Sequence, residues 1–130
     1  CAQFLYHWPF ARMGENAHRH LASLNAATVD SDKIKPGLAY SRQIGNCYSA
    51  ALYLSLISAL ESTDQDLTGK PIALFSYGSG AVAEFFSGMV QPGYRAQLFT
   101  DRHQMLMANR VALSDDHYVD LWQAPDPQNG

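Results

Sequence analysis

Hydrophobic residues recur at helical spacing in the first part of the chain. From Pro9 to about Ala26 this spacing predicts a helix with one apolar face, made of Phe10, Met13, Ala17, Leu21 and Leu24. Pro9 suits the first turn of this helix, where a backbone N–H would have no partner. His18 and His20 are two residues apart, so they do not align to share a metal ion, and we expect them on the solvent-exposed face.

A second helix is predicted from about Cys47 to Ser62, and apolar residues surround it. Its polar interruptions are small: Ser49, Ser55 and Ser58. A helix that is apolar all round is usually buried all round. Because 130 residues offer little structure to enclose it, we expect that the chain either dimerises through this helix or continues into a partner domain.

The rest of the chain predicts strands and short helices, which makes the fold class α/β. The run Ile72–Ser76 is continuously apolar, as in a central strand buried on both faces. Residues 81–86 and 94–99 are predicted as further strands, with Gln91-Pro92-Gly93 as a hairpin turn between them.

Polar segments complete the predicted organisation. We expect a polar loop over residues 28–37 and a helix from Asp101 to about Ala108. Ser114 is expected to cap a last helix that runs through Trp122. Residues 125–130 are predicted to be a disordered tail.

Composition and charge exclude several classes of partner. The net charge of −3 argues against nucleic acid or an anionic membrane as a partner, because both require a basic surface. No apolar run reaches the length of a bilayer span. The two cysteines, Cys1 and Cys47, are too few for a disulfide scaffold or a zinc site, so we expect no metal and a reducing, cytoplasmic compartment. Cys47 itself is expected to be a small buried hydrophobe.

Three places could carry chemistry, and each also has a purely structural interpretation. His7 lies among aromatic residues, where it could be a core histidine or a neutral imidazole that binds a carbonyl group. Asn46 precedes the second helix, where it could cap the helix or donate hydrogen bonds to a ligand.

The third place is the segment Phe75-Ser76-Tyr77-Gly78-Ser79-Gly80, directly after the predicted buried strand. Its glycines could serve a tight turn that needs positive φ, or they could allow a ligand to approach the backbone. It is not a P-loop, because no Gly-Lys-Ser/Thr follows it, and it is not a nucleophile elbow, because Tyr77 stands in place of the first glycine.

Together, three segments resemble hydroxymethylglutaryl-CoA synthase, particularly its bacterial form. They are His-x-Pro-Phe-x-Arg-Met-Gly (7–14), Gly-Asn-x-Tyr-x-Ala-x-Leu-Tyr-Leu-Ser-Leu-Ile-Ser (45–58) and Phe-Ser-Tyr-Gly-Ser-Gly-x-x-x-Glu-Phe-Phe-Ser-Gly (75–88). The similarity extends to Trp122 and corresponds to the C-terminal third of the family's chain. It implies that residues 1–124 form the C-terminal part of a thiolase-like layered fold, with a mixed sheet and a buried central helix.

The resemblance also implies a reaction and its substrates. The family condenses acetyl-CoA with acetoacetyl-CoA to 3-hydroxy-3-methylglutaryl-CoA in the mevalonate route to isoprenoids, and it needs no further cofactor. A Cys nucleophile carries the acetyl group, a Glu removes a methyl proton, and the carbanion attacks the ketone of the second substrate. Both residues belong to the N-terminal half of the family's chain, so we expect these 130 residues alone to be inactive. The implied partners are CoA thioesters, the N-terminal half of the same enzyme and a second subunit in a homodimer.

Site residues carry over one at a time. By resemblance, His7 and Asn46 bind the acceptor carbonyl of acetoacetyl-CoA, and Ser79, with Tyr77 and Gly78, belongs to a loop that lines the catalytic pocket. Arg12 stands where the family usually has a Lys near CoA.

The sequence departs from the family pattern at Glu15 and Asn16, where a pair of Lys is common. This departure leaves open a synthase that acts on polyketide chains bound to a carrier protein. The absence of the nucleophilic Cys and the base Glu from these 130 residues leaves open a second alternative, a thiolase-like binding module without its own catalysis.

Overall fold

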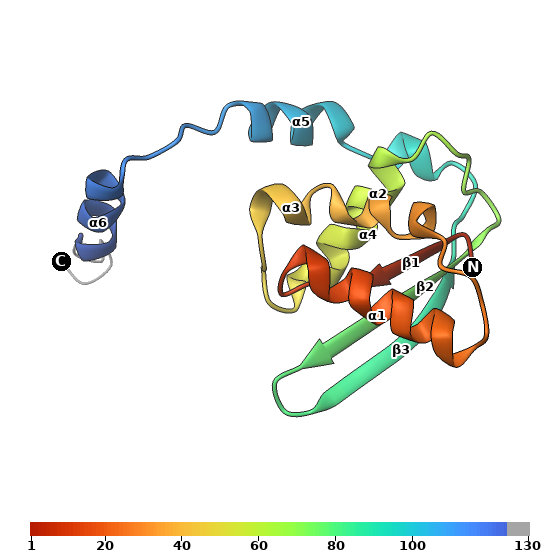
Figure 1. The fold of residues 1–130 in the computed structure, drawn as a ribbon. Helices are drawn as coiled ribbons and strands as arrows, with labels where there is room; N and C mark the ends of the chain where they lie inside the picture. The colour runs from red at the N-terminus through yellow and green to blue at the C-terminus, as the bar shows by residue number, and fades with distance from the viewer. Residues whose placement is uncertain (125–130) are drawn as a thin grey trace. The chain divides into compact units, whose positions relative to one another are not determined.

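The computed structural model describes residues 1–124, so the expected disordered tail, residues 125–130, lies outside the described residues. The chain divides into two compact units, of which the first is Cys1–Thr100 and the second begins at Asp101. Figure 1 shows their secondary structure. The first unit contains the sheet and the candidate site, whereas the described part of the second contains only helices.

A three-stranded mixed sheet forms the centre of the first unit. β1 (Gln3–Tyr6) pairs in parallel with β2 (Pro71–Gly78), which pairs in antiparallel fashion with β3 (Val82–Met89) (Figure 1). The predicted buried strand at residues 72–76 is therefore confirmed as the central strand. The pairing of β1 with β2 spans a long crossover that contains helices, as parallel pairing requires.

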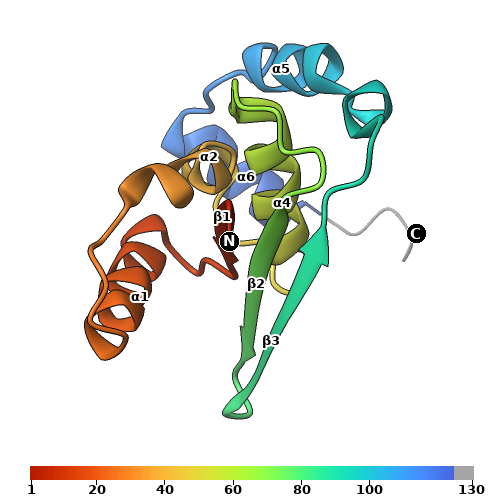
Figure 2. The same ribbon diagram turned by 90° about the vertical axis from the view of Figure 1, so that its right-hand side faces the viewer.

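Two hydrophobic clusters form on the sheet, one for each side of β1. α4 (Ala50–Ser62) supplies Leu52 and Ala59 to a cluster with Leu5 and Leu74. The other cluster joins Tyr6 and Trp8 to Ile34, Leu38, Phe4, Phe75 and Ala17, the last of which is on α1 (Ala11–Leu24). Because successive strand residues point to opposite faces, Leu5 and Tyr6 belong to different clusters. Figure 2 shows α1 and α4 beside the strands.

The first predicted helix is present, but its buried face differs from the predicted one. α1 begins at Ala11, two residues after Pro9, and Phe10 and Leu24 are largely exposed. The residues that α1 buries are Gly14, His18 and Ala22, so the prediction that His18 is exposed is wrong. The reason is a hydrogen bond of 2.9 Å between the Tyr6 hydroxyl and His18 Nδ1, which brings an imidazole into the core.

Residues 28–37 are more ordered than the predicted polar loop. They contain the 3₁₀ helix η1 (Ser31–Lys33) and the start of α2 (Lys35–Leu38), which α3 (Ser41–Ile44) follows. Ile34 and Leu38 are buried in the core, and two apolar residues so close in sequence indicate a segment that packs against the sheet.

The predicted hairpin at residues 91–93 is wrong, and so is the strand at residues 94–99. The hairpin instead joins β2 to β3 through residues 79–81, and Tyr94–Gln97 form the 3₁₀ helix η2 after Gly93, which has a φ of +80°. The Tyr94 hydroxyl accepts a hydrogen bond from the backbone N–H of Leu67, so the aromatic residue packs on a turn rather than in a sheet.

The apolar helix α4 is covered on one side only by the described residues. Ala51, Leu52, Ser55, Ser58 and Ala59 are buried, whereas Tyr53 is 60% exposed and Ile57 is 36% exposed. The prediction of a helix enclosed on all sides is therefore not met within this chain, and an apolar stripe of α4 faces outward.

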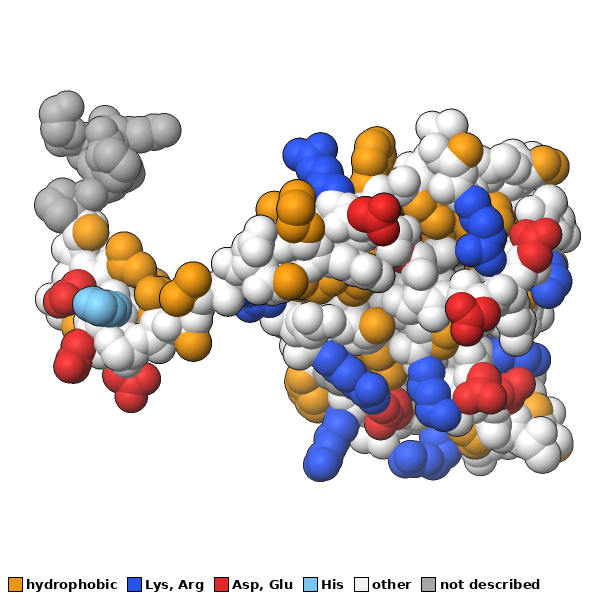
Figure 3. All heavy atoms as spheres, turned by 90° about the horizontal axis from the view of Figure 1, so that it is seen from above, with side chains coloured by type: hydrophobic (Ala, Val, Ile, Leu, Met, Phe, Trp, Pro, Cys, Tyr) orange, Lys and Arg blue, Asp and Glu red, His pale blue; other side chains and the backbone are white. Residues whose placement is uncertain are grey.

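The second unit contains α5, which begins at the boundary residue (Thr100–Ala108), and α6 (Asp115–Gln123), as predicted. Ser114 caps α6, because its hydroxyl accepts a hydrogen bond from the N–H of His117 at 3.3 Å. In residues 1–124 no helix combines the length and the apolar character needed to cross a bilayer. On the face shown in Figure 3, Lys and Arg side chains are interspersed with Asp and Glu.

Candidate active site

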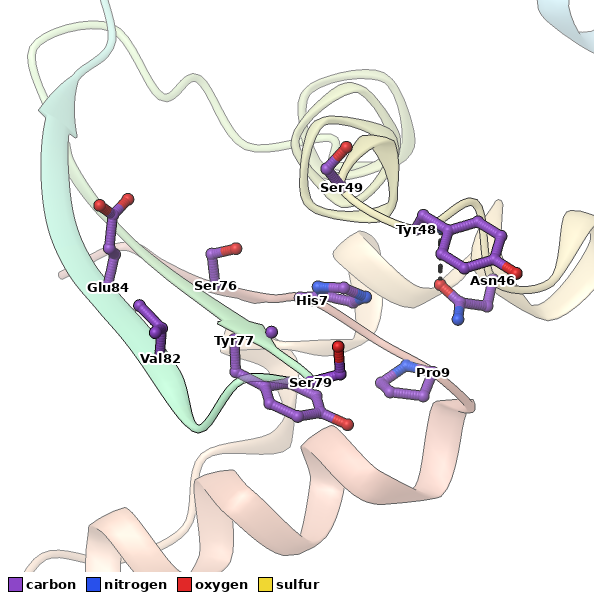
Figure 4. Close-up of a pocket in the computed structure, with 11 residues that line it drawn as sticks. His7, Pro9, Asn46, Tyr48, Ser49, Ser76, Tyr77, Ser79, Val82 and Glu84 are labelled. Carbon is purple, nitrogen blue, oxygen red and sulfur yellow. Dashed lines mark hydrogen bonds between the residues drawn. The ribbon is translucent and has the colours of Figure 1, made fainter.

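An open pocket of about 470 Å³ lies where three segments of the first unit come together. These segments are the end of β1, the loop before α4, and the β2–β3 hairpin (Figure 4). The residues that line it are His7, Pro9, Asn46, Tyr48, Ser49, Ser76, Tyr77, Gly78, Ser79, Val82 and Glu84. The structure thus brings together five of the six predicted site residues.

The backbone of His7 continues the strand pairing beyond β1. Its N–H donates to the carbonyl oxygen of Phe75 at 2.8 Å, and its ring packs against the Tyr77 ring with centroids 5.5 Å apart. The ring atom Nδ1 is buried and has no hydrogen-bond partner among the described residues. His7 is therefore not a satisfied core histidine, and its imidazole remains available to a ligand in the pocket.

Asn46 does not cap the helix, which corrects the structural interpretation of this residue. The N-cap of α4 is Ser49, and the Asn46 side-chain oxygen instead accepts a hydrogen bond from the N–H of Tyr48 at 3.0 Å. This short turn follows Gly45, whose φ of +85° favours glycine. Because the side-chain oxygen is engaged, the amide NH₂ of Asn46 is the group left to donate into the pocket.

The Ser76–Gly80 segment forms the end of β2 and the start of the hairpin. The one residue of the hairpin turn with positive φ is Ala81, at +55°, and neither Gly78 nor Gly80 has a positive φ. A Cβ at Gly78 would meet only the carbonyl oxygen of Val82, at 3.9 Å. A tight turn therefore does not require these glycines, which favours the alternative in which a ligand approaches the backbone closely.

Glu84 is a pocket residue that the sequence analysis did not select. It pairs with Ser76 across the β2–β3 ladder, so the two side chains lie on the same face of the sheet, and both line the pocket. Figure 4 shows its carboxylate on β3, on the far side of Ser76 from His7. The alternation of side chains along two paired strands was the signal that could have found it.

Arg12 lies outside the pocket, and Cys47 lies outside the helix in which it was predicted. Arg12 is exposed on α1 and does not line the pocket. Cys47 precedes α4 instead of lying within it, and it is half-buried. Glu15, three residues after Arg12 on α1, accepts a hydrogen bond from Arg42 at 2.9 Å. This bond connects α1 to α3. Within the described residues, no three His, Cys, Asp or Glu side chains are close enough to hold a metal ion.

Comparison with known families identifies the chain. Residues 11–124 match the family described as "Hydroxymethylglutaryl-coenzyme A synthase C terminal". The chain is 42% identical to hydroxymethylglutaryl-CoA synthase of Enterococcus faecalis, over 87% of this chain and 30% of that protein. It is 36% identical to a polyketide biosynthesis 3-hydroxy-3-methylglutaryl-ACP synthase of Bacillus subtilis, over 91% of this chain and 30% of that protein.

Solved structures agree with these matches. The HMG synthase of the curacin biosynthetic pathway, in complex with a holo donor-ACP, has a TM-score of 0.83 and 35% identity and covers 92% of this chain and 31% of its own. An HMG-CoA synthase complexed with CoA has a TM-score of 0.76 and 37% identity and covers 95% of this chain and 33% of its own. The chain spans about three tenths of the length of the curated relatives it matches. The resemblance of the three motifs is thereby confirmed, and the chain belongs to the hydroxymethylglutaryl-CoA synthase family of acyltransferases, as its C-terminal region.

Proposed function

We propose that this chain is the C-terminal region of an enzyme that condenses acetyl-CoA with acetoacetyl-CoA, in the mevalonate pathway of the cytoplasm. The observation that carries the proposal is the pocket in which His7, Asn46 and Ser79 converge from three distant segments. In this assignment the three residues bind the acceptor thioester. The products are 3-hydroxy-3-methylglutaryl-CoA and free CoA.

The available hydrogen-bond donors suit a ketone acceptor. The His7 ring and the Asn46 NH₂ group polarise the acceptor carbonyl and stabilise the alkoxide that forms when the carbanion adds to it. Ser79 completes the polar wall, and the Tyr77–Gly78 backbone lies along the thioester. The Cys nucleophile and the Glu base come from the N-terminal part of the enzyme, so these residues alone carry out no turnover.

The proposed CoA site combines the pocket with a cation on the surface. A related HMG-CoA synthase has been solved with CoA bound. Arg12 is exposed on α1, the helix that follows Pro9 at the pocket, and its guanidinium can bind a phosphate in bidentate fashion. Because Arg12 does not line the pocket, the proposal makes it a phosphate ligand and not a group that contacts the reacting atoms.

The test separates the two half-reactions in the protein that carries this chain. His7→Ala is expected to slow condensation by about 10²–10³-fold, because it removes a group that acts on the second substrate. Acetylation of the enzyme by acetyl-CoA alone should be nearly unchanged. Equal loss of both half-reactions would contradict the proposal, and so would an unaffected condensation.

A second candidate function is condensation on a carrier protein. Two observations favour it: the similarity to an HMG-ACP synthase and to a synthase solved with a donor-ACP, and the acidic Glu15 near the exposed Arg12. Steady-state kinetics with an acetoacetyl group on CoA or on holo-ACP distinguish the two. We expect the higher kcat/KM with CoA, and a preference for the ACP thioester would establish the second function instead.

In this proposal, the exposed apolar residues of α4 form an interface within the whole enzyme. Tyr53 and Ile57 pack against the N-terminal part of the same enzyme, which completes a thiolase-like layered fold, and the whole enzyme is a homodimer. Ile57→Asp is expected to reduce the yield of folded enzyme, as measured by light scattering after size exclusion. An unchanged, fully active dimer would contradict this packing. A stable 130-residue chain that binds CoA without any partner would instead favour a binding module.

A further inference from the structure

Trp8, the residue after His7, is held by a hydrogen bond from the opposite side of the core. Its indole is 1% exposed, and its Nε1–H donates to Ser55 Oγ of α4 at 3.2 Å. Ser55 is 0% exposed. It also lies against α2, because a Cβ on Gly37 would be 2.7 Å from its Oγ. The bond joins residues 47 positions apart in sequence and fixes the end of β1 to the central helix.

The ring of Trp8 is also enclosed from the other side. A Cβ at Gly14 of α1 would be 1.7 Å from Cζ3 of the indole, so only glycine permits this contact. The Tyr6 ring packs edge-on against the same indole, with centroids 5.4 Å apart. We call Ser55, Gly14 and Tyr6 the Trp8 clamp. Three different elements contribute to it, so the indole has one position available.

His7 has fewer constraints of its own. Its backbone N–H is anchored to Phe75, but its buried Nδ1 has no partner in the described part of the chain. In many sites a second hydrogen bond fixes the orientation of a functional imidazole. The ring itself contacts only the Tyr77 ring among the described aromatic pairs. The position of the imidazole therefore also depends on the backbone of residues 7 and 8, which Phe75 holds on one side and Trp8 on the other.

We propose that Trp8, held by the clamp, is a positioning residue that sets the location of the His7 imidazole in the pocket. This inference rests on the proposed role of His7. Of the residues involved, Gly14 and Ser55 stand at fixed positions of the motifs quoted above, whereas Trp8 stands at an open position of His-x-Pro-Phe. A displacement of about 1 Å at a reacting group can cost on the order of 10²-fold in rate, so loosening the indole slows condensation.

The chain offers a matched pair of serines for the test. Ser55 and Ser58 are both 0% exposed on α4, but Ser58 bonds to Pro36 and Tyr40 and not to Trp8. In the protein that carries this chain, both Ser→Ala variants should lower the thermal midpoint. We expect Ser55→Ala alone to lower kcat of condensation, by about tenfold or more, with little change in the rate of enzyme acetylation.

A second variant tests the same hydrogen bond from its other end. Trp8→Phe keeps an aromatic ring but removes the donor, and it should reproduce the effect of Ser55→Ala. In the double variant the loss should be no larger than in either single one, because the two residues act through one bond. Equal kcat losses in Ser55→Ala and Ser58→Ala, or unchanged kcat in both Ser55→Ala and Trp8→Phe, would overturn the inference. His7→Ala measured alongside distinguishes the two proposals: if it leaves condensation intact, the proposed function fails, and if it alone abolishes condensation, only the role of Trp8 fails.

Discussion

Two neighbouring residues at the end of β1, Tyr6 and His7, show how the two faces of the sheet use polar groups differently. Tyr6 is 6% exposed, and its hydroxyl is bonded to His18. His7 lines the pocket, and its buried Nδ1 has no partner among the described residues. Each face thus contains a histidine. The Nδ1 of His18 forms a hydrogen bond with a described side chain, whereas the Nδ1 of His7 does not.

The difference separates stability from ligand binding. Buried polar groups that are bonded contribute to the folded state, whereas a buried group without a partner costs free energy until a ligand supplies one. We infer that substitutions of Tyr6 and His18 change stability, that substitutions in the pocket change rate, and that the Trp8 clamp, which joins the two, changes both. The four predictions below test this separation.

The largest expected effect is that of Asn46→Ala on the rate of condensation. Loss of the amide donor should lower the rate by about 10²–10³-fold, by analogy with oxyanion-hole residues. The free energy of unfolding should fall by only about 1 kcal/mol, because one exposed turn bond to Tyr48 is lost. The rate of CoA release measures the first effect, and urea denaturation measures the second.

Asn25→Ala is the matched control. Asn25 ends α1 and donates to the carbonyl of Leu21, outside the pocket. Its replacement should leave the condensation rate unchanged. A large stability loss in Asn46→Ala with an unaltered rate would mean that Asn46 serves the fold and not the substrate.

Gly14→Ala has the next largest effect, on stability. The added Cβ would lie 1.7 Å from the Trp8 ring, so α1 or the indole has to move, and overpacking of this kind costs about 1–3 kcal/mol. Gly88→Ala is the control, because its Cβ would meet Ile72 at 3.9 Å, an ordinary contact distance. We expect a lower urea midpoint for the first variant only, and equal midpoints would contradict the packing at Trp8.

Much of the fold followed from local patterns in the sequence. The apolar run at residues 72–76 predicted the central strand, and Ser114 predicted the start of α6, because both signals act over a few residues. The position of the hairpin could not be predicted from local patterns. Gln91-Pro92-Gly93 has suitable turn residues, but the long ladder from Pro71 to Met89 decides the pairing.

Contacts between distant residues explain most of what the sequence could not reveal. His18 was assigned to the surface because its partner, Tyr6, is 12 residues away and belongs to a strand. The pocket residues His7, Asn46 and Ser79 could be predicted together only because three motifs resemble one family. Arg12 lies outside the pocket lining, and its predicted place near CoA stays a prediction, because the position of a side chain relative to a ligand depends on helix placement.

Tyr6→Phe tests the contribution of the Tyr6–His18 hydrogen bond to stability, and its expected effect is smaller than that of Gly14→Ala. Loss of the hydroxyl leaves His18 Nδ1 without its partner, which should cost about 1 kcal/mol of unfolding free energy. Tyr77→Phe is the control on the pocket face, since Tyr77 is 37% exposed and contacts His7 through its ring. Its effect on stability should be below about 0.5 kcal/mol. Equal effects in urea denaturation would show that the Tyr6–His18 bond contributes nothing.

The smallest predicted effect is the pH dependence that Tyr6 and His18 give to the free energy of unfolding. Burial lowers the pKa of His18 below its ordinary value of 6.5, an effect that Asp30 opposes and Lys33 reinforces. The unfolded chain therefore binds a proton that the folded chain does not, so stability is lost as the pH falls below about 6.5. Burial raises the pKa of Tyr6 from 10.0 to about 12, so stability is also lost as the pH rises above about 10.

Urea midpoints measured from pH 5 to pH 11 should thus decline towards both ends of this range. His18→Asn should flatten the acidic side. Tyr6→Phe should reduce the alkaline decline without abolishing it, because burial and Glu61 also raise the pKa of Tyr40. His20→Asn, which removes an exposed histidine on the same helix, should change neither side. An acidic decline that survives in His18→Asn would assign it to another group.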